Sequence, residues 1–338
     1  MIAKLTWGMI VGNVGISEQL YPVLIMHQES AETGGPTMDS GPKRTEISQS
    51  PLQAESVLKY YHAKTEGIIR KYGPGPDIHY HAGLFSADKH DLEALSYEAI
   101  RLGIINSQRA LVSYAAESWP RGGFGLQLID IGAGLGGPAI QWASQYAANI
   151  TCLTNIHDHV SIIMWMAEEA GVSHLLKPHL ADIHRLEGIG KFDSAFAFES
   201  TGYMHRPELF EKVRSALRPN SRFGIADHFV RDVESARKVD AYAQTRLGSL
   251  DEYVESAEQA GFTLDKNEDL SEHTAKYWMW QQGWAHAKLR SLNGSGPEAL
   301  TVKTLRSAAK AYGEFRRMWL DHGLETRLLL FRLLPGMA

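Results

Sequence analysis

The stretch Leu126–Gly137, L-Q-L-I-D-I-G-A-G-L-G-G, joins an apolar run to a cluster of glycines. Leu128, Ile129 and Ile131 follow the nearly continuous apolar pattern of a parallel strand that is buried on both faces. Glycines have no Cβ, so the backbone after this strand can turn sharply and approach a ligand closely. Pro138 then suits the first turn of a helix, whose free N–H groups would point at that ligand. The stretch therefore predicts an α/β sheet with a nucleotide-binding loop after one of its strands.

The glycine spacing is compatible with two classes of cofactor site. Gly132, Gly134 and Gly137 satisfy the dinucleotide fingerprint G-x-G-x-x-G, whereas Gly132, Gly134 and Gly136 satisfy the G-x-G-x-G of sites for S-adenosylmethionine (SAM). A third interpretation is that the glycines serve only the tight packing of a strand against a helix. Helical sequence precedes the first predicted strand, whereas the nucleotide fold of a dehydrogenase commonly opens its domain. This placement favours the SAM site.

Composition narrows the range of partners. The chain has 338 residues, of which 44% are hydrophobic and 22% are charged, so it is long enough for about two domains or for one large domain with an added cap. The net charge of -5 shows no basic excess and argues against nucleic acid as a partner. The single cysteine, Cys152, excludes an internal disulfide and is typical of a cytoplasmic protein. No apolar run approaches the roughly 20 residues that a membrane span needs.

Residues 1–49 are expected to form a mobile N-terminal arm and linker. Met1–Met26 is moderately apolar but is interrupted by glycines and a proline, and His27–Gln49 is rich in Ser, Thr, Gly, Glu and Pro. The apolar side of the arm must dock somewhere, and we expect it to cover the active site of a neighbouring subunit in a homo-oligomer, with Tyr21 entering the pocket. Residues 50–338 are expected to form the catalytic domain.

The predicted domain opens with helical sequence. Ser50–Gln53 is a capping box with a proline in the first turn, and its helix ends at the Gly-Pro-Gly-Pro turn of residues 73–76. Ile78–Phe85, I-H-Y-H-A-G-L-F, follows as an aromatic and histidine-rich segment. His79 and His81 are candidates for metal ligands or for pocket residues. Because no carboxylate or cysteine stands nearby at metal-binding spacing, we favour the pocket and predict no metal.

A helical pattern over Asp91–Trp119 leads into the sheet, and polar residues then follow three more predicted strands. Asn149–Thr154, the run that ends at His179–Leu180 and the run Phe192–Phe198 are the strands in question. Carboxyl ends of parallel strands meet at the edge where open α/β sheets bind ligands, so we expect the residues that follow them to share a site. These residues are Thr154, Asn155, His159, Asp182, Ile183 and Glu199.

The order of these motifs resembles class I SAM-dependent methyltransferases, especially the branch that methylates alkene carbons of sterols, fatty acids and prenyl diphosphates. Ile129–Pro138 resembles the first motif of the sterol enzymes, Glu199–Tyr203 (E-S-T-G-Y) resembles their acid-led segment, and Ile78–Phe85 resembles the segment before their substrate pocket. Within this branch the chain is most similar to enzymes that methylate the terpenoid arm of an indole alkaloid. The resemblance implies a Rossmann-like sheet with helices on both faces and a helical cap over about residues 230–320.

The resemblance also assigns a cofactor site for SAM, with S-adenosylhomocysteine (SAH) as the product. The glycines would pass under the methionine and ribose, with an acid fixing the loop or the amino group. The residues after the second strand would face the ribose, and those after the third would hold the adenine. The implied contacts are Asp130, Gly132, Gly134, Gly136, Thr154, Asn155, His159, Asp182, Ile183 and Glu199. Such enzymes work by in-line transfer, in which proximity supplies much of the rate.

The candidate catalytic residues lie on the acceptor side. An alkene that takes up a methyl cation becomes a carbocation, which the enzyme must stabilise and then deprotonate or steer into ring closure. Glu199 is the strongest candidate for this role, and its alternative role is only to bind the cofactor or the backbone. Tyr203 and His228 are predicted at the same edge as possible proton acceptors. His79 and Tyr80 would orient the acceptor, a hydrophobic small molecule.

The sequence departs from two patterns of this family, and other functions are compatible with it. Ile78–Phe85 contains no cysteine of the kind that cyclopropane synthases carry, and no acidic magnesium motif is present for a diphosphate. The alternative functions are an O- or N-methyltransferase of a natural product, an NAD(P)-dependent oxidoreductase, and a binding protein without activity. An aromatic stripe on a helix over residues 273–290 is expected to be core or, if it faces the cofactor, an acceptor pocket. The stripe consists of Tyr277, Trp278, Trp280 and Trp284.

Overall fold

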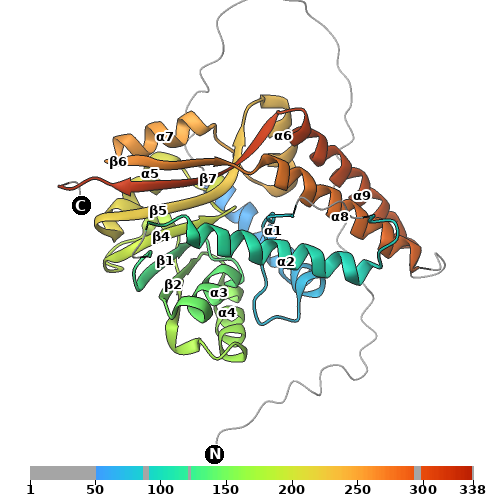
Figure 1. Ribbon diagram of the computed structural model, residues 1–338, viewed down its shortest axis with the longest axis horizontal. Coiled ribbons are helices and arrows are strands. Elements are labelled where there is room, and N and C mark those ends of the chain that lie inside the picture. The colour runs from blue at the N-terminus through green and yellow to red at the C-terminus, as the bar shows by residue number, and fades with distance from the viewer. Residues whose placement is uncertain (1–50, 87–90, 121–122, 293–297, 337–338) are drawn as a thin grey trace, which may run out of the picture.

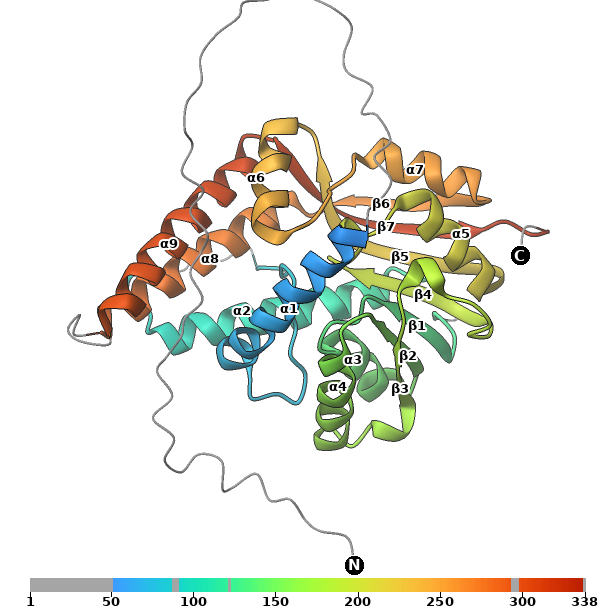
Figure 2. The ribbon, with the colours of Figure 1, turned by 180° about the vertical axis from the view of Figure 1, so that it is seen from behind.

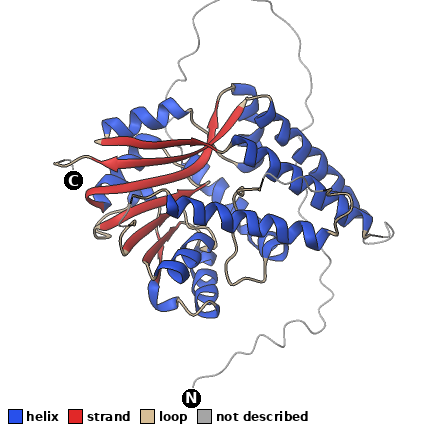
Figure 3. Ribbon diagram, in the orientation of Figure 1, coloured by secondary structure: helices blue, strands red, loops and turns tan. Residues whose placement is uncertain are grey.

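A seven-stranded sheet with helices on both faces forms the centre of the computed structural model, which describes residues 51–86, 91–120, 123–292 and 298–336 (Figures 1 and 3). The strand order is β3-β2-β1-β4-β5-β7-β6. Strand β7 runs antiparallel to both of its neighbours, while β1 to β5 pair in parallel. The predicted α/β methyltransferase-like sheet is therefore confirmed. The predicted arm, residues 1–49, and its Tyr21 lie outside the described residues.

The elements have the following bounds. The strands are β1 (Gln127–Ile131), β2 (Asn149–Thr154), β3 (Leu176–Leu180), β4 (Phe192–Phe198), β5 (Leu217–Val230), β6 (Phe262–Asp269) and β7 (Leu324–Leu333). The α-helices are α1 (Pro51–Tyr72), α2 (Tyr97–Glu117), α3 (Gly137–Tyr146), α4 (His157–Glu169), α5 (Arg206–Ala216), α6 (Val233–Ala243), α7 (Leu250–Gln259), α8 (Ser271–Arg290) and α9 (Glu298–Leu320). Short 3₁₀ helices include η3 (Ile183–Arg185) and η4 (Thr201–Tyr203).

Two apolar cores lie on opposite faces of the sheet. On one face, Trp142 of α3 and Ile163 of α4 pack with residues of α1, α2 and α8. On the other face, Phe210 of α5 and Tyr253 of α7 are fully buried against β4, β5 and β7. Because both faces are covered, the strands carry apolar residues on both sides, which explains the continuous apolar runs of the sequence. The views from front and back show the two helix layers (Figures 1 and 2).

Helix α2 is shorter than the sequence pattern suggested. The pattern predicted a helix over Asp91–Trp119, but the helix starts at Tyr97. Ser96 has an extended backbone, and its side chain accepts a hydrogen bond from the N–H of Ala99 at 3.2 Å. A serine cap of this kind satisfies one of the free N–H groups of a helix end and sets the start of the helix. The apolar residues before it therefore belong to a turn rather than to the helix.

Helices α8 and α9 extend beyond one end of the sheet (Figure 1). The range of about 230–320 that was predicted as a cap contains α6, α8 and α9, and it also contains α7 and β6, which belong to the sheet layers. Tyr277 and Trp280 of the aromatic stripe are buried in the core against α1 and α2, with Trp278 and Trp284 packed at its margin. Among the described residues, no helix is long and apolar enough to span a membrane.

Candidate active site

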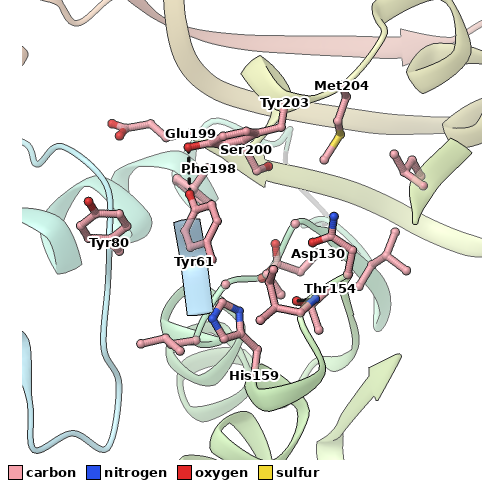
Figure 4. Close-up of a pocket in the computed structure, with 18 of the residues that line it drawn as sticks. Tyr61, Tyr80, Asp130, Thr154, His159, Phe198, Glu199, Ser200, Tyr203 and Met204 are labelled. Atoms are coloured by element: carbon pink, nitrogen blue, oxygen red, sulfur yellow. Dashed lines mark hydrogen bonds between the residues drawn. The ribbon is translucent and has the colours of Figure 1, made fainter. Parts of the chain in front are cut away.

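A cavity opens at the carboxyl ends of β1, β2 and β4, where the sequence predicts a ligand site (Figure 4). The empty space in and above it, open solvent at the mouth included, amounts to about 1150 Å³. The predicted site residues that line it are Tyr80, Asp130, Gly132, Gly134, Thr154, Asn155, His159, Asp182, Ile183, Glu199 and Tyr203. The predicted residues Gly136, His79 and His228 are described by the structure but do not line this cavity.

The glycine loop after β1 forms the floor. Gly132, Gly134 and Gly136 all have positive φ angles, of 76°, 53° and 81°. A Cβ on Gly132 would lie 2.6 Å from the Cβ of Ser200, so packing within the protein excludes a side chain there. A Cβ on Gly134 would meet no atom within 4 Å. Gly134 therefore faces open space, and only a ligand would collide with a side chain at this position.

Gly136 has a different role from the one that the sequence implied. It is the N-terminal cap residue of α3, and a Cβ there would press on Ile163 at 3.1 Å. It allows α3 and α4 to pack closely and does not line the cavity. Gly137, which the dinucleotide fingerprint uses, is required for packing as well, because a Cβ would lie 2.4 Å from the carbonyl oxygen of Ile78.

The carboxyl group of Asp130, at the end of β1, is suited to bind a cationic group. Its side chain is buried, and among the described residues no group donates a hydrogen bond to its Oδ2 atom. Burial raises the pKa of this carboxyl well above its ordinary value. A cationic group in the cavity would satisfy the orphaned oxygen and restore the charge. The α-ammonium group of SAM has this chemistry, so the floor of the cavity suits that cofactor.

The wall after β2 offers neutral polar groups. Thr154 uses its hydroxyl to accept the N–H of Ile156 at 3.2 Å and so shapes the turn, while Asn155 stays exposed at the rim. His159, in the first turn of α4, places Nε2 3.0 Å from the hydroxyl of Thr65 and leaves Nδ1 without a partner among the described residues. Burial lowers the pKa of His159 to about 4, so the ring is neutral and can bond to a hydroxyl.

The wall after β3 supplies an apolar surface. Asp182 caps η3, because its Oδ1 accepts the N–H of His184 at 2.9 Å. The cap holds Ile183 buried against the cavity. An apolar side chain here suits the face of a flat base such as adenine.

Glu199, directly after β4, faces the cavity from the opposite side (Figure 4). Its backbone has a φ of 44°, in the left-handed region that costs a non-glycine residue about 1 kcal/mol or more. Its N–H still bonds to the carbonyl of Ala226 at 2.8 Å, which extends the pairing of β4 with β5 by one residue. Oε1 accepts the N–H of Ala82 at 2.6 Å, and Oε2 lies 3.5 Å from Nε2 of His228.

The partners of Glu199 decide its charge. Burial alone would raise the pKa of this carboxyl, but the charge and hydrogen bond of His228, with smaller effects of His81 and of the Ala82 N–H, hold it below its ordinary value. Burial also opposes charge on His228, and the carboxylate of Glu199 raises the pKa of its imidazole. His228 does not line the cavity but supports Glu199 from behind. The site therefore holds a partly buried carboxylate that is ionised at neutral pH.

Tyrosines also line the part of the cavity that contains Glu199. Tyr61 of α1 donates its hydroxyl to Tyr203 at 3.0 Å, and Tyr203 donates to the carbonyl of Ala243 at 3.0 Å. Burial raises the pKa of Tyr203 well above its ordinary value, so this phenol is not a base at neutral pH. Tyr80 lies on the far side of Tyr61 from Asp130 (Figure 4). The predicted tyrosines thus form walls of the cavity.

His79 lies outside the cavity. It is buried, and its ring nitrogens lie 3.2 Å from Nε2 of His81 and 3.4 Å from Asp77, a carboxylate that also pairs with Arg109. It therefore holds the histidine-rich segment in place. The neighbouring His81 lines the cavity and stacks on Phe198 at 5.3 Å between ring centroids.

Several lining residues were missed by the predicted site. They include Tyr61, Phe198, Ser200 and Met204, whereas His81 was correctly expected as a pocket residue. Phe198, Ser200 and Met204 had a signal in the sequence, because they stand within or beside the segment F-E-S-T-G-Y. Tyr61 had no such signal, since it is one of many apolar positions on α1, more than one hundred residues before the sheet edge that it contacts.

Comparison with known proteins identifies the family. Residues 122–302 match the mycolic acid cyclopropane synthetase family. The sterol 24-C-methyltransferase of Aspergillus fumigatus is 27% identical over 163 residues, covering 44% of this chain and 42% of that protein. The 27-O-demethylrifamycin SV methyltransferase of Amycolatopsis mediterranei is 29% identical over 165 residues, covering 46% and 60%. The chain spans about half the length of the curated relatives it matches.

A solved structure confirms the fold. Geranyl diphosphate C-methyltransferase from Streptomyces coelicolor, crystallised with Mg²⁺, geranyl diphosphate and SAH, superposes with a TM-score of 0.67 at 15% identity, over 85% of this chain and all of that one. The antiparallel β7 beside β5 also departs from the 3-2-1-4-5-6 order of dinucleotide-binding folds. The chain therefore belongs to the mycolic acid cyclopropane synthetase family of SAM-dependent methyltransferases, with the class I methyltransferase fold.

Proposed function

We propose that this protein is a SAM-dependent C-methyltransferase that acts on an alkene carbon of a terpenoid or prenyl small molecule. One observation carries the proposal: an ionised, partly buried carboxylate, Glu199, shares a cavity with the glycine loop and with several aromatic rings. In transfer to a hydroxyl or amine, a carboxylate would serve only as a general base that removes the proton of the acceptor. Transfer to an alkene creates a carbocation, which such a charge stabilises.

In this proposal, different residues serve different steps of the reaction. When bound, SAM supplies an electrophilic methyl group, and the alkene that bonds to it is left with a positive charge on carbon. Glu199 then stabilises that charge and accepts the proton that is lost when an alkene forms again. Ring faces of Tyr61 and Phe198 favour a cation through their quadrupoles. His228 donates to Glu199 and keeps the carboxylate oriented.

The acceptor that we favour is an indole-terpenoid of the teleocidin type, whose terpenoid arm would be methylated and would then cyclise. Support comes from the residues that line the cavity beside Glu199. They include the aromatic rings of Tyr61, Tyr80, Phe198 and Tyr203 and the imidazole of His81. Aromatic rings and hydrogen-bonding groups together suit a flat heteroaromatic group that carries oxygen atoms.

The N-terminal arm remains part of the proposal. We propose that residues 1–49 of one subunit cover the cavity of a neighbour in a homo-oligomer, with Tyr21 entering the acceptor side. Deletion of residues 1–49 should then change both the number of subunits in the oligomer, measured by light scattering, and the turnover number. If neither changes, the arm does not take part in the site.

Product analysis with a labelled methyl donor tests the reaction. SAM that carries a ¹³C-methyl group is incubated with the protein and with a geranylated indole, geranyl diphosphate or a side-chain-unsaturated sterol. We expect the label to appear on carbon in the NMR spectrum of the product. A label on oxygen or nitrogen would replace the proposal with the alternative heteroatom transfer. Binding of NADH in place of SAH would return the chain to the oxidoreductase alternative.

A further inference from the structure

We propose that Thr326 of β7 is a positioning residue that controls how His228 carries protons, and through His228 the charge of Glu199. The catalytic meaning of this inference rests on the function proposed above. Thr326 pairs directly with His228 in the register of β5 and β7, and both side chains are buried.

Three polar atoms surround the hydroxyl of Thr326. Nε1 of Trp319 on α9 lies 2.9 Å away, Oγ1 of Thr274 on α8 lies 2.8 Å away, and Nδ1 of His228 lies 2.8 Å away. Thr274 and Trp319 are fully buried as well, at 1% and 2% exposure, so water does not compete for these bonds. The cluster joins the two helices inserted between β6 and β7 to the acid–base pair.

Counting donors and acceptors gives a direction for each bond when His228 is neutral and its Nε2 donates to the carboxylate of Glu199. An indole N–H can only donate, and a hydroxyl has one proton and two acceptor sites. With Trp319 and Thr274 donating to Thr326, both acceptor sites are filled. The proton of Thr326 then goes to Nδ1 of His228. The neutral imidazole therefore carries its own proton on Nε2, which faces Oε2 of Glu199.

The same chain of hydroxyls can reverse when His228 becomes charged. Nδ1–H then donates to Thr326, Thr326 donates to Thr274, and Thr274 turns to the carbonyl of Leu270, 3.5 Å away. The last bond is long, yet no charged donor is left without a partner. Thr326 is therefore a partner for Nδ1 in both protonation states of His228.

Charged groups around His228 are few in the described structure. Glu199 faces Nε2 from the end of β4, and Asp227, the preceding residue of β5, acts on the ring while it accepts the N–H and hydroxyl of Thr201. Glu325, which precedes Thr326 on β7, is paired with Arg231 and with Arg327. From β7, α8 and α9, the contacts to this ring system are hydroxyl and indole groups.

Replacing the hydroxyl by a methyl group gives the critical variant. In Thr326→Val a protonated Nδ1 would face a methyl group, whereas a neutral Nδ1 would lose only an accepted bond. A buried charged donor without a partner costs more than a bare acceptor. The pKa of His228 should therefore fall by about one unit, a tenfold change in its protonation equilibrium. Thr326→Ser keeps the hydroxyl and should leave this pKa unchanged within a factor of about two in the equilibrium.

The test is an NMR titration of the full chain labelled with ¹⁵N-histidine, with the signals of His228 assigned by their loss in His228→Gln. We expect Nε2 to carry the proton of neutral His228 in the unmodified protein, and we expect the lowered pKa in Thr326→Val alone. Methyl transfer provides a second readout: kcat should fall in Thr326→Val but not in Thr326→Ser, with SAH affinity equal in both.

Two outcomes would overturn the inference. One is an equal pKa of His228 in the Val and Ser variants. The other is a neutral form of the unmodified protein with its proton on Nδ1, a measurement that decides the matter even if Thr326→Val does not fold. Absence of methyl transfer in every protein would instead count against the proposed function, and the NMR result would stand separately.

Discussion

The side of the cavity that we propose for the cofactor contains Asp130, the side that we propose for the acceptor contains Glu199, and the two carboxyl groups are held in opposite ways. Asp130 has an oxygen without a partner among the described residues, and burial raises its pKa. Burial also acts on Glu199, but His228, His81 and Ala82 lower its pKa. The proposal therefore places an unpartnered carboxyl group where a cation would bind and an ionised carboxylate where a cation would form.

The two sides also differ in how the chain builds them. The side that we propose for the cofactor comes from the segments that follow β1, β2 and β3. The acceptor side combines α1, the segment after it, and the ends of β4 and β5, joined by side-chain hydrogen bonds such as Tyr61 to Tyr203. A substitution on one side should therefore leave ligand binding on the other side unchanged.

The largest effect is expected for Gly134→Asp on the cofactor side. A side chain here meets no protein atom but occupies the space of the ligand. SAH affinity should fall by about a thousandfold, equivalent to about 4 kcal/mol. The positive φ of 53° strains any side chain, so the thermal unfolding temperature should fall about as much as in the control variant Gly171→Asp. Calorimetry measures the affinity. Gly171→Asp is the matched control, since Gly171 is exposed, has a φ of 73° and also has free space for a Cβ. Equal affinities in the two variants would remove the glycine loop from the cofactor site.

Glu199→Gln should give the next largest effect, on the acceptor side. The amide keeps the shape of the side chain but removes the charge that stabilises the carbocation and the group that accepts its proton. The rate of methyl transfer should fall about a hundredfold or more, and SAH affinity should stay within a few-fold. Single-turnover kinetics separate the two. Glu211→Gln, an exposed change on α5, serves as the control. A loss of SAH affinity as large as the loss of rate would make Glu199 a cofactor ligand instead.

Asp130 predicts a pH dependence of cofactor binding. Its raised pKa in the free protein should fall when a cationic amino group binds, so binding should release a proton from Asp130. SAH affinity should then rise with pH, by at most about tenfold per unit, until it levels above the pKa of the free protein. Calorimetry in buffers of different ionisation enthalpy counts the protons released. Asp130→Asn should abolish this dependence, and a pH dependence that survives in the variant would have another source.

The smallest effect is expected for Tyr61→Phe. It removes the hydrogen bond between α1 and Tyr203 but keeps the ring at the cavity wall. A neutral hydrogen bond contributes about 0.5–1.5 kcal/mol, so the KM for the acceptor should rise about twofold to tenfold. SAH affinity should not change. Tyr146→Phe, an exposed tyrosine on α3, is the control. Weaker SAH binding in Tyr61→Phe would show that the two sides are coupled.

Sequence patterns predicted more of the residues that line the cavity near the glycine loop than of those near Glu199, for a physical reason. Gly132, Gly134 and Asp130 belong to one strand and its loop, so local spacing reveals them. Tyr61 and Thr326 come near Glu199 or its partner His228 only through tertiary packing, which leaves no local pattern. Gly136 shows the limit of a motif, because it caps α3 and a side chain there would press on Ile163 of α4, while it does not line the cavity.

A crystal structure of the full chain with SAH would test the division of the cavity most directly. We predict that the amino group of SAH contacts Asp130 and that the SAH molecule passes directly over Gly134. We also predict that its sulfur atom points toward Glu199 and Tyr61. An SAH molecule bound elsewhere, or one whose sulfur points away from Glu199, would contradict the assignment of the two sides.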